Sequence, residues 1–336
     1  MKRCIIFICI FFFVLPILAK NKAILIGVSD YPQESGWCKL SSVHDVELLK
    51  TKFPTTWEIS TLIDREANYK GIITTLYNIA QCAFSGDTVF IHFSGHGQQM
   101  VPINSDEADS LEVDKLDEAF VPIDANKEWS QAYDGSKHLR DDELSHLVNL
   151  IRNRIGKNGF VIVTLDACHS DNMDRGDCDS TSVVYRGTSD IFGEVVTPKD
   201  IECRFYRDTT LIELSNNANV VYISACQSHS QNKEINIEGV GYGSLSYAIG
   251  NALDPFNLSD IKGFIDNIVL TMNEYAKYQT PGIRSSFNYS MPQYENNITS
   301  NITQSTINTT SHKILFPIVL LVLIITVLSI LKTQIR

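Results

Sequence analysis

The chain has 336 residues, of which 44% are hydrophobic and 20% are charged, a composition that suits a globular protein with a sizeable core. Its formal net charge is -11 at pH 7 and it has no concentrated basic run, which argues against a nucleic acid as partner. Its 8 cysteines lack the close pairwise spacing of a zinc site.

The beginning of the chain, residues 1–19, has the pattern of a secretory signal peptide. The segment Met1–Arg3 is basic, an apolar block follows from Cys4 to Leu18, and the block ends at the small residue Ala19. We expect cleavage after Ala19, so that the mature protein begins at residue 20. An uncleaved amino-terminal anchor is the alternative, because Ile17 stands where a small residue is usual before a cleavage site.

Between residues 20 and 290, apolar β-branched runs alternate with helical patterns. The apolar runs predict strands at Ala23–Val28, Trp57–Ile63, Thr88–Phe93, Phe160–Leu165 and Val220–Ser224. The helical patterns lie at His44–Lys52, Tyr69–Ala83, Asp141–Ile155 and Gly243–Leu253. Strands that alternate with helices of this length indicate an α/β fold with a mostly parallel central sheet and helices on both faces.

Two of these strands end at residues that suit nucleophilic catalysis. The strand Thr88–Phe93 is followed by His96 in a Ser-Gly-His-Gly turn, and the strand Phe160–Leu165 is followed by Cys168. In an open α/β sheet, side chains at the carboxyl ends of the strands meet at one edge. A thiol beside an imidazole is the smallest unit for acyl transfer, because the thiolate attacks and the imidazole carries the proton. We therefore predict Cys168 as nucleophile and His96 as general base and acid.

The oxyanion that forms in such a reaction needs hydrogen-bond donors, and the backbone N–H groups of Gly97 and Cys168 are the predicted ones. Two other histidines compete with His96 for the role of base. His92 lies further back along its strand and suits a structural role, while His169 would point away from the nucleophile on an extended backbone. The alternative is that Cys168 is a buried structural cysteine and His96 an unrelated loop histidine. The position of both residues at strand ends argues against this alternative.

The segments His92–Gly97 and Asp166–Ser170 resemble the paired active-site motifs of metacaspases, a family of caspase-like cysteine peptidases. The resemblance extends over roughly residues 22 to 290 and includes Lys22–Gly27, Glu118–Asp124 and Tyr222–Gln227. It implies a caspase-like three-layer sandwich and an endopeptidase that cleaves protein or peptide substrates after Arg or Lys.

The resemblance also implies which residues form the pocket for the basic side chain, namely Asp45, Ser94 and Asp166, with Ser42 where many metacaspases have a cysteine. Asp166 lies two residues before Cys168, on the same side of an extended strand, as a wall of this pocket requires. Two carboxylates in one pocket repel each other unless a cation enters between them, and the planar guanidinium of an arginine suits that need.

The chain departs from the family at three places. The first is Ser42, and the second is Asp171, which replaces a glycine after the cysteine motif and adds a negative charge near the nucleophile. The third is the segment after Cys226, which lacks an acidic pair that many relatives carry. These departures bear on the selectivity of the pocket and on the reactivity of Cys168.

The chemistry requires no cofactor, but many metacaspases need calcium. The resemblance implies Asp141 and Asp142 as calcium ligands, with Asp174 a poor match for a third. Capping of the predicted helix that begins at Asp141 is the structural alternative. Residues 104–118 are strongly acidic and predict a solvated loop, although they are a further possible source of calcium ligands.

A long insert separates the cysteine strand from the last predicted strand. We expect the enzyme to cut this insert itself, between Asp171 and Asp208, because the segment is long and polar and begins close to the nucleophile. Its basic residues, after which cleavage is expected, are Arg175, Arg186, Lys199, Arg204 and Arg207.

The end of the chain predicts a stalk and a membrane anchor. Residues 291–313 are rich in Asn and Thr and predict a disordered stalk. Residues 314–331 are apolar and uncharged, long enough for a transmembrane helix, and residues 332–336 form a basic tail expected in the cytoplasm. A signal for a lipid anchor is a weaker alternative. The catalytic domain is thus expected on the exported side, where Asn257, Asn288, Asn297, Asn301 and Asn308 match the acceptor pattern for glycosylation.

Two other functions compete with that of a membrane-tethered peptidase. A lumenal transamidase of caspase-like fold shares the layout of signal, domain and single span, but its motif around the cysteine differs. A catalytically weak interaction module on a stalk is the second alternative, and the presence of both His96 and Cys168 argues against it.

Overall fold

The computed structural model describes residues 21–101, 116–168, 183–193, 216–227 and 231–291. The chain divides into one unit that ends at Tyr289 and a second that begins at Ser290, and the fold below is that of the first. The predicted signal peptide, the transmembrane segment 314–331 and all but the first residue of the predicted stalk lie outside the described residues. None of the helices in the described ranges is long and apolar enough to cross a membrane.

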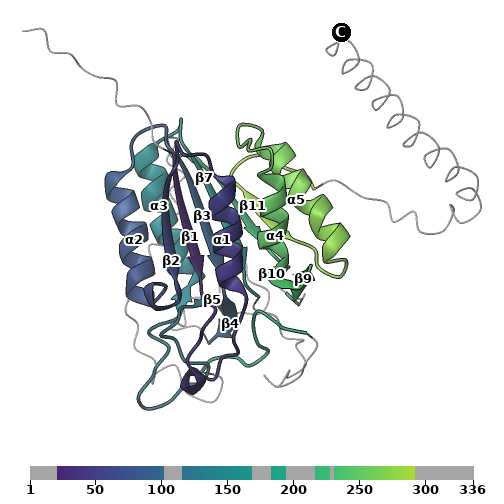
Figure 1. Ribbon diagram of the computed structural model, residues 1–336. Coiled ribbons are helices and arrows are strands. Elements are labelled where there is room, and N and C mark those ends of the chain that lie inside the picture. Colours follow the sequence, from purple (N-terminus) through teal and green to yellow (C-terminus); the bar gives the residue numbers. More distant parts are fainter. Residues whose placement is uncertain (1–20, 102–115, 169–182, 194–215, 228–230, 292–336) are drawn as a thin grey trace, which may run out of the picture. The chain divides into compact units, whose positions relative to one another are not determined.

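A six-stranded sheet forms the centre of the domain, with the strand order β11-β8-β7-β3-β1-β2 (Figure 1). All neighbouring strands are parallel except β11, which pairs with β8 in antiparallel fashion. The strands are β1 (Lys22–Gly27), β2 (Glu58–Ile63), β3 (Thr88–Ser94), β7 (Phe160–Asp166), β8 (Asn219–Ser224) and β11 (Gly282–Ser285). Five of them confirm predicted strands to within a residue at each end, whereas β11 was not predicted.

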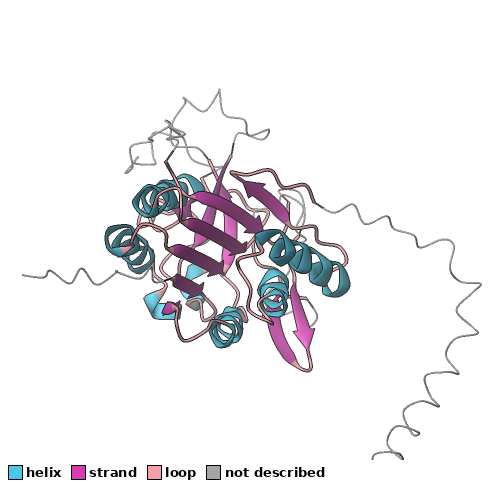
Figure 2. Cartoon of the chain, turned by 90° about the horizontal axis from the view of Figure 1, so that it is seen from above, coloured by secondary structure: helices cyan, strands magenta, loops and turns pink. Residues whose placement is uncertain are grey.

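Helices cover both faces of this sheet, as Figure 2 shows from above. The helices α2 (Tyr69–Cys82) and α3 (Asp141–Ile155) pack together on one face. The other face carries α1 (Ser42–Lys52), α4 (Ser244–Ala252) and α5 (Ile261–Tyr275), of which α5 was not predicted. The predicted three-layer α/β architecture is therefore confirmed for the described domain.

Smaller elements complete the fold at one end of the sheet. A three-stranded antiparallel sheet contains β4 (His96–Met100), β5 (Asp117–Val121) and β6 (Leu139–Arg140). A separate hairpin consists of β9 (Glu234–Ile237) and β10 (Val240–Gly243). Two short 3-10 helices lie at Gln33–Ser35 and Asp64–Glu66.

The acidic segment 104–118 was predicted to be a solvated loop, and this is wrong for its described end. Asp117 begins strand β5, is only 5% exposed, and forms a buried ion pair with Arg140. A carboxylate can be buried in this way because the guanidinium beside it supplies the opposite charge. Most of the segment, residues 104–115, lies outside the described residues.

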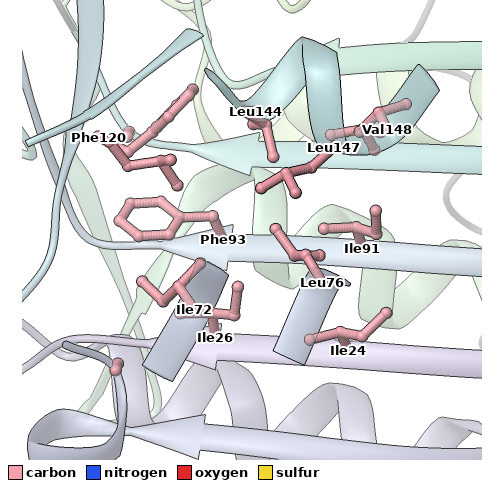
Figure 3. Packing of buried hydrophobic residues seen from close by; sticks show 14 of the residues in the cluster. Ile24, Ile26, Ile72, Leu76, Ile91, Phe93, Phe120, Leu144, Leu147 and Val148 are labelled. Atoms are coloured by element: carbon pink, nitrogen blue, oxygen red, sulfur yellow. The ribbon is translucent and has the colours of Figure 1, made fainter. Parts of the chain in front are cut away.

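Alternation along the strands decides which side chains face which helices. Ile24, Ile26, Ile91 and Phe93 belong to the core cluster that also contains Ile72 and Leu76 of α2 and Leu144 and Leu147 of α3 (Figure 3). The intervening residues of β3 point the other way, because strand side chains alternate. Accordingly Phe90 contacts Phe264 of α5, His92 reaches Ser246 of α4, and Ser94 donates a hydrogen bond to Asp45 of α1. The polar carboxyl ends of the central strands therefore open toward α1 and α4.

Candidate active site

The two predicted reactive residues leave neighbouring strands at the same edge of the sheet. Strands β3 and β7 pair so that Ser94 lies opposite Asp166, and the backbone N–H of Gly95 donates to the carbonyl of Asp166. His96 and Cys168 each follow two residues later, and their exposed fractions are 2% and 0%. The structure thus brings both residues to the carboxyl edge of adjacent parallel strands, as the sequence predicts.

The imidazole of His96 is held by aromatic packing and by one backbone carbonyl. It stacks on Trp37 with ring centroids 4.7 Å apart, and the ring of Tyr31 lies 5.0 Å away. Its Nε2 atom lies 2.9 Å from the carbonyl oxygen of Cys38. Because a carbonyl only accepts, Nε2 carries the proton and Nδ1 presents a lone pair. Nδ1 is buried and has no hydrogen-bond partner among the described residues, so it is the atom available to take a proton.

Burial lowers the pKa of His96 to about 3, which keeps the imidazole neutral at physiological pH. The hydrogen bond to Cys38 opposes this shift, while the positive charges of Arg186 and Lys127 add to it. A neutral imidazole with one fixed N–H has a lone pair on the other nitrogen that can accept a proton.

A pocket beside Cys168 is filled by an arginine of the chain itself. The guanidinium of Arg186 is fully buried, and its Nη2 atom lies 2.8 Å from Asp45 Oδ2 and 2.8 Å from Glu234 Oε1. Its Nη1 atom donates to Ser94 Oγ at 2.5 Å and lies 3.8 Å from Asp166 Oδ1. Three carboxylates and a hydroxyl therefore surround one cation, and three of the four residues predicted for the pocket, Asp45, Ser94 and Asp166, contact it.

Neighbouring hydrogen bonds hold these carboxylates. Asp45 accepts from the backbone N–H of Gly243 at 2.9 Å, in addition to the bond from Ser94. Asp166 accepts from Asn232 Nδ2 at 2.7 Å and from both the backbone N–H and the hydroxyl of Ser246. Because Asn232 and Ser246 together donate three hydrogen bonds to it, the carboxylate of Asp166 is held in one orientation.

The pKa values of the two carboxyl groups move in opposite directions. Burial raises the pKa of Asp45 to about 6, although the guanidinium of Arg186 works against that shift. Burial would also raise the pKa of Asp166, but the guanidinium and the bonds from Ser246 and Asn232 outweigh it and hold the pKa below its usual value. Burial alone would lower the pKa of Arg186, but the surrounding carboxylates raise it, so this side chain stays charged.

The backbone of Arg186 occupies the predicted oxyanion position. Its carbonyl oxygen accepts from the N–H of Cys168 at 2.9 Å and from the N–H of Gly97 at 3.3 Å. The next residue, Gly187, lies so close that a Cβ atom there would approach the carbonyl oxygen of Cys168 to 2.1 Å. The side chain of Arg186 fills the pocket while the bond that follows it lies against Cys168.

The chain around Arg186 is held as an added β-strand. The N–H of Arg186 donates to the carbonyl of Asn232 at 3.0 Å, and the N–H of Glu234 donates to the carbonyl of Val184 at 2.9 Å. Tyr185 forms an antiparallel bridge with Lys233. Extended peptides bind at a sheet edge in this way, with backbone bonds for affinity and a side-chain pocket for specificity.

Ser42 and His92 are buried near this site but have different surroundings from Arg186 and its partners. Ser42 is buried in α1, and its hydroxyl has no hydrogen-bond partner among the described residues. His92 is fully buried between Thr164 and Ser246, which its two ring nitrogens contact, and burial lowers its pKa to about 4. This arrangement supports its structural assignment. His169 and Asp171 lie outside the described residues.

Asp141 and Asp142 form the first turn of α3, where carboxylates suit the helix dipole. No group of three or more His, Cys, Asp or Glu side chains in the described ranges is arranged to hold a metal ion. Calcium prefers about six to eight oxygen ligands, which these two carboxylates alone do not provide. Asp174 lies outside the described residues, so calcium binding stays a prediction and no step below uses it.

Several residues of the site were not predicted from the sequence. Glu234 and Asn232 come from the segment after Cys226, which has no acidic pair but supplies one carboxylate and one amide. Trp37 stacks on His96 from a loop with no recognisable motif. Cys226 places its Sγ atom 3.2 Å from the Sγ atom of Cys168. Two signals in the sequence point to Cys226, its place after a predicted strand and its place in the segment Tyr222–Gln227 that resembles the family.

Comparison with known proteins places the chain in a family. A family model described as "Caspase domain" matches residues 20–290. Metacaspase-7 of Arabidopsis thaliana is 30% identical over 163 residues, which cover 46% of this chain and 35% of the relative. Metacaspase-1 of Mycosarcoma maydis is 28% identical over 160 residues, which cover 45% of this chain and 36% of the relative. The match thus spans about a third of the length of these curated relatives.

A solved structure is similar in fold. The crystal structure of a Geobacter sulfurreducens protein aligns with a TM-score of 0.53 and covers 81% of this chain and 95% of that chain. The sequence identity is 20%, so this likeness concerns the fold alone.

Proposed function

Because the chain belongs to the caspase-domain family of cysteine peptidases, we propose that it is an endopeptidase that uses Cys168 and His96 to cleave after arginine or lysine. The observation that carries this proposal is Arg186, which is bound as a substrate residue would be. Its side chain lies among Asp45, Asp166 and Glu234, and its carbonyl accepts from the N–H groups of Cys168 and Gly97.

The reaction follows from this arrangement. The thiolate of Cys168 attacks the carbonyl carbon, and the two N–H groups stabilise the oxyanion that forms. His96 Nδ1 takes the proton of the Cys168 thiol and passes it to the leaving amine, while its Nε2–H stays on the carbonyl of Cys38. Water, activated by the same imidazole, then hydrolyses the thioester and releases the carboxylate product. A fixed Nε2–H bond keeps the ring in one orientation through both steps.

We propose further that the described state is a latent form that processes itself at the Arg186–Gly187 bond. The insert carries five basic residues suited to cleavage, and Arg186 is the one that lies in the described part of the insert. An external substrate needs the same pocket and the same N–H groups, so it competes with this segment. Cutting after Arg186 gives this segment a free carboxyl end, so that it can leave the pocket and other peptide chains can enter.

The pocket favours arginine over lysine in this proposal. The two terminal nitrogens of a guanidinium contact Asp45, Glu234 and Ser94 at the same time. An ammonium group is a single point and does not reproduce the planar fork. Substrates are therefore peptides with Arg, and less efficiently Lys, before the scissile bond.

We also propose that the enzyme acts on the exported side of a membrane, held by the segment 314–331. The support is the pattern of an amino-terminal signal and a carboxyl-terminal apolar segment, with acceptor sites for glycosylation between them. Cys38 is disulfide-bonded, and disulfides persist mainly in oxidising compartments. A glycosidase shift and protease protection of the full-length protein in sealed microsomes test this placement.

Peptidase activity is tested with the full-length protein and a peptide library that varies the residue before the scissile bond. Wild type is expected to cleave after Arg, then after Lys, and both Cys168→Ala and His96→Ala are expected to be inactive. The matched control is Cys82→Ala, because Cys82 is an exposed cysteine at the end of α2. Equal turnover by wild type and Cys168→Ala, or a preference for Asp, would overturn the proposal.

A further inference from the structure

Two cysteines meet at the carboxyl edge of the central sheet. The Sγ atoms of Cys168 and Cys226 lie 3.2 Å apart, and neither residue is in a disulfide. Cys168 is fully buried and Cys226 is 8% exposed. The established chemistry of cysteine peptidases uses one thiol, so the second thiol beside the nucleophile has no part in the reaction described above.

We propose that Cys168 and Cys226 form a reversible disulfide that switches the site off. The bond itself does not depend on the proposed function, whereas its effect on activity rests on Cys168 being the nucleophile.

The backbone favours this bond. Cys168 and Cys226 each follow the end of a strand, and these strands, β7 and β8, are parallel neighbours. Neighbouring strands lie about 4.8 Å apart, within the range of Cα separations that disulfides span. A disulfide has an S–S distance of about 2.05 Å, so the sulfurs need to approach by roughly 1 Å. Rotation of two side chains provides such a movement without a change in the sheet.

The surroundings of Cys168 and Cys226 also favour the disulfide. The side chain of Cys226 donates its S–H toward Cys168, so the two sulfurs already face each other. The pKa of Cys226 is raised by this contact and by burial, so Cys226 stays a thiol until Cys168 has been oxidised and loses its proton only as it attacks the sulfenic acid. Elsewhere in the same chain Cys38 is disulfide-bonded, so disulfide chemistry is already part of this protein.

The reaction with hydrogen peroxide balances in two steps. The thiolate of Cys168 attacks an oxygen of the peroxide, an S–O bond forms, the O–O bond breaks, and with a proton the first water leaves. The sulfur of Cys226 then attacks the sulfur of this sulfenic acid, an S–S bond forms and the S–O bond breaks. The hydroxide that leaves takes the thiol proton of Cys226 as a second water. Two thiols are oxidised by two electrons, and one peroxide is reduced to two waters.

The segment that fills the pocket controls when this reaction occurs. The backbone of Arg186 and Gly187 lies directly against Cys168 and covers the nucleophile in the latent form. Removal of this segment exposes Cys168 to substrate and to oxidant together. The disulfide therefore limits the activity of the opened enzyme, and it also protects Cys168 from irreversible oxidation to a sulfinic acid.

The test uses full-length protein both before and after it has cut itself after Arg186. Both samples are treated with hydrogen peroxide, alkylated and digested for mass spectrometry. We expect a peptide in which Cys168 and Cys226 are joined with the loss of two hydrogens, and its reversal by dithiothreitol. Cys82→Ser is the matched control and should behave as wild type, because Cys82 is exposed on a different element. In Cys226→Ser, peroxide should convert Cys168 to a sulfinic or sulfonic acid that dithiothreitol does not reverse.

The outcomes separate this inference from the proposed function. Oxidation of Cys168 to a sulfinic acid in wild type, while Cys226 is still alkylated, overturns the disulfide whatever the activity. Formation of the linked peptide without loss of peptidase activity supports the disulfide and contradicts the role of Cys168 as nucleophile. The mapping of wild type is decisive by itself, so the inference is tested even where Cys226→Ser does not fold.

Discussion

Substitution of Arg186 by lysine isolates the contribution of the guanidinium fork to self-processing. The charge is kept, but one ammonium group replaces two nitrogens that together contact Asp45, Glu234 and Ser94. At least one charge-assisted hydrogen bond is lost, and such a bond contributes about 1.5–3 kcal/mol. Each 1.36 kcal/mol corresponds to a tenfold change in rate, so we expect cleavage to slow by roughly 10- to 150-fold.

The assay follows the disappearance of full-length protein on a gel and identifies the new amino terminus by sequencing. Arg186→Gln, which removes the charge, should abolish cleavage at this bond. Arg175→Lys is the matched control, since it makes the same change at another basic residue of the insert, and it should cleave at the rate of wild type. Cleavage of Arg186→Lys at the wild-type rate and at the same bond would refute the reasoning about the fork.

The remaining predictions concern the pocket, the dyad and the pH dependence of stability. Glu234→Gln should reduce kcat/KM for arginine peptides by about tenfold or more, because one charge-assisted contact is weakened. Glu238→Gln, in the turn of the same hairpin, is the control and should leave kcat/KM unchanged. Equal effects of the two substitutions would contradict the role of Glu234. Cys168→Ala should abolish activity and leave the thermal midpoint within a few degrees of wild type, and a large fall in that midpoint would point to a structural role instead. The stability of uncleaved Cys168→Ala protein should fall as the pH drops from about 6.5 toward 3, because burial lowers the pKa of His92 to about 4 and that of His96 to about 3. Burial likewise lowers the pKa of His138, a buried residue just before β6, to about 3. These neutral histidines must take up protons when the chain unfolds, so each contributes a slope of roughly 1.4 kcal/mol per pH unit in that window. The raised pKa of Asp45 opposes this loss of stability but does not cancel it, because one carboxyl group acts against three histidines. Chemical denaturation curves that do not change between pH 7 and pH 4.5 would contradict this prediction.

The central strands could be predicted because each is an apolar run bounded by polar turns. β3 and β7 are buried on both sides, so most of their residues are apolar, and the polar residues at their carboxyl ends, Ser94 and Asp166, belong to the pocket. Cys168 and His96 could be placed for the same reason, since strand ends in a parallel sheet converge. Strand β11 and the short antiparallel strands escaped prediction because their sequences carry no strong apolar period.

The pocket could be predicted only in part. Asp45 and Asp166 lie in recognisable motifs. Glu234 reaches the guanidinium of Arg186 from a hairpin that pairs with the segment around Arg186, and no spacing in the sequence predicts that pairing. The insert was expected to be cut, with five basic residues as equal candidates. Choosing Arg186 among them required the tertiary contacts that place its carbonyl on the N–H groups of Cys168 and Gly97.

The most direct test of the account is the amino-terminal sequence of the fragment that full-length wild-type protein produces during incubation. The account predicts a new terminus at Gly187 in wild type and none in Cys168→Ala or His96→Ala. A fragment that begins elsewhere, or the same fragment in Cys168→Ala, would contradict the claim that this site is a peptidase closed by its own Arg186.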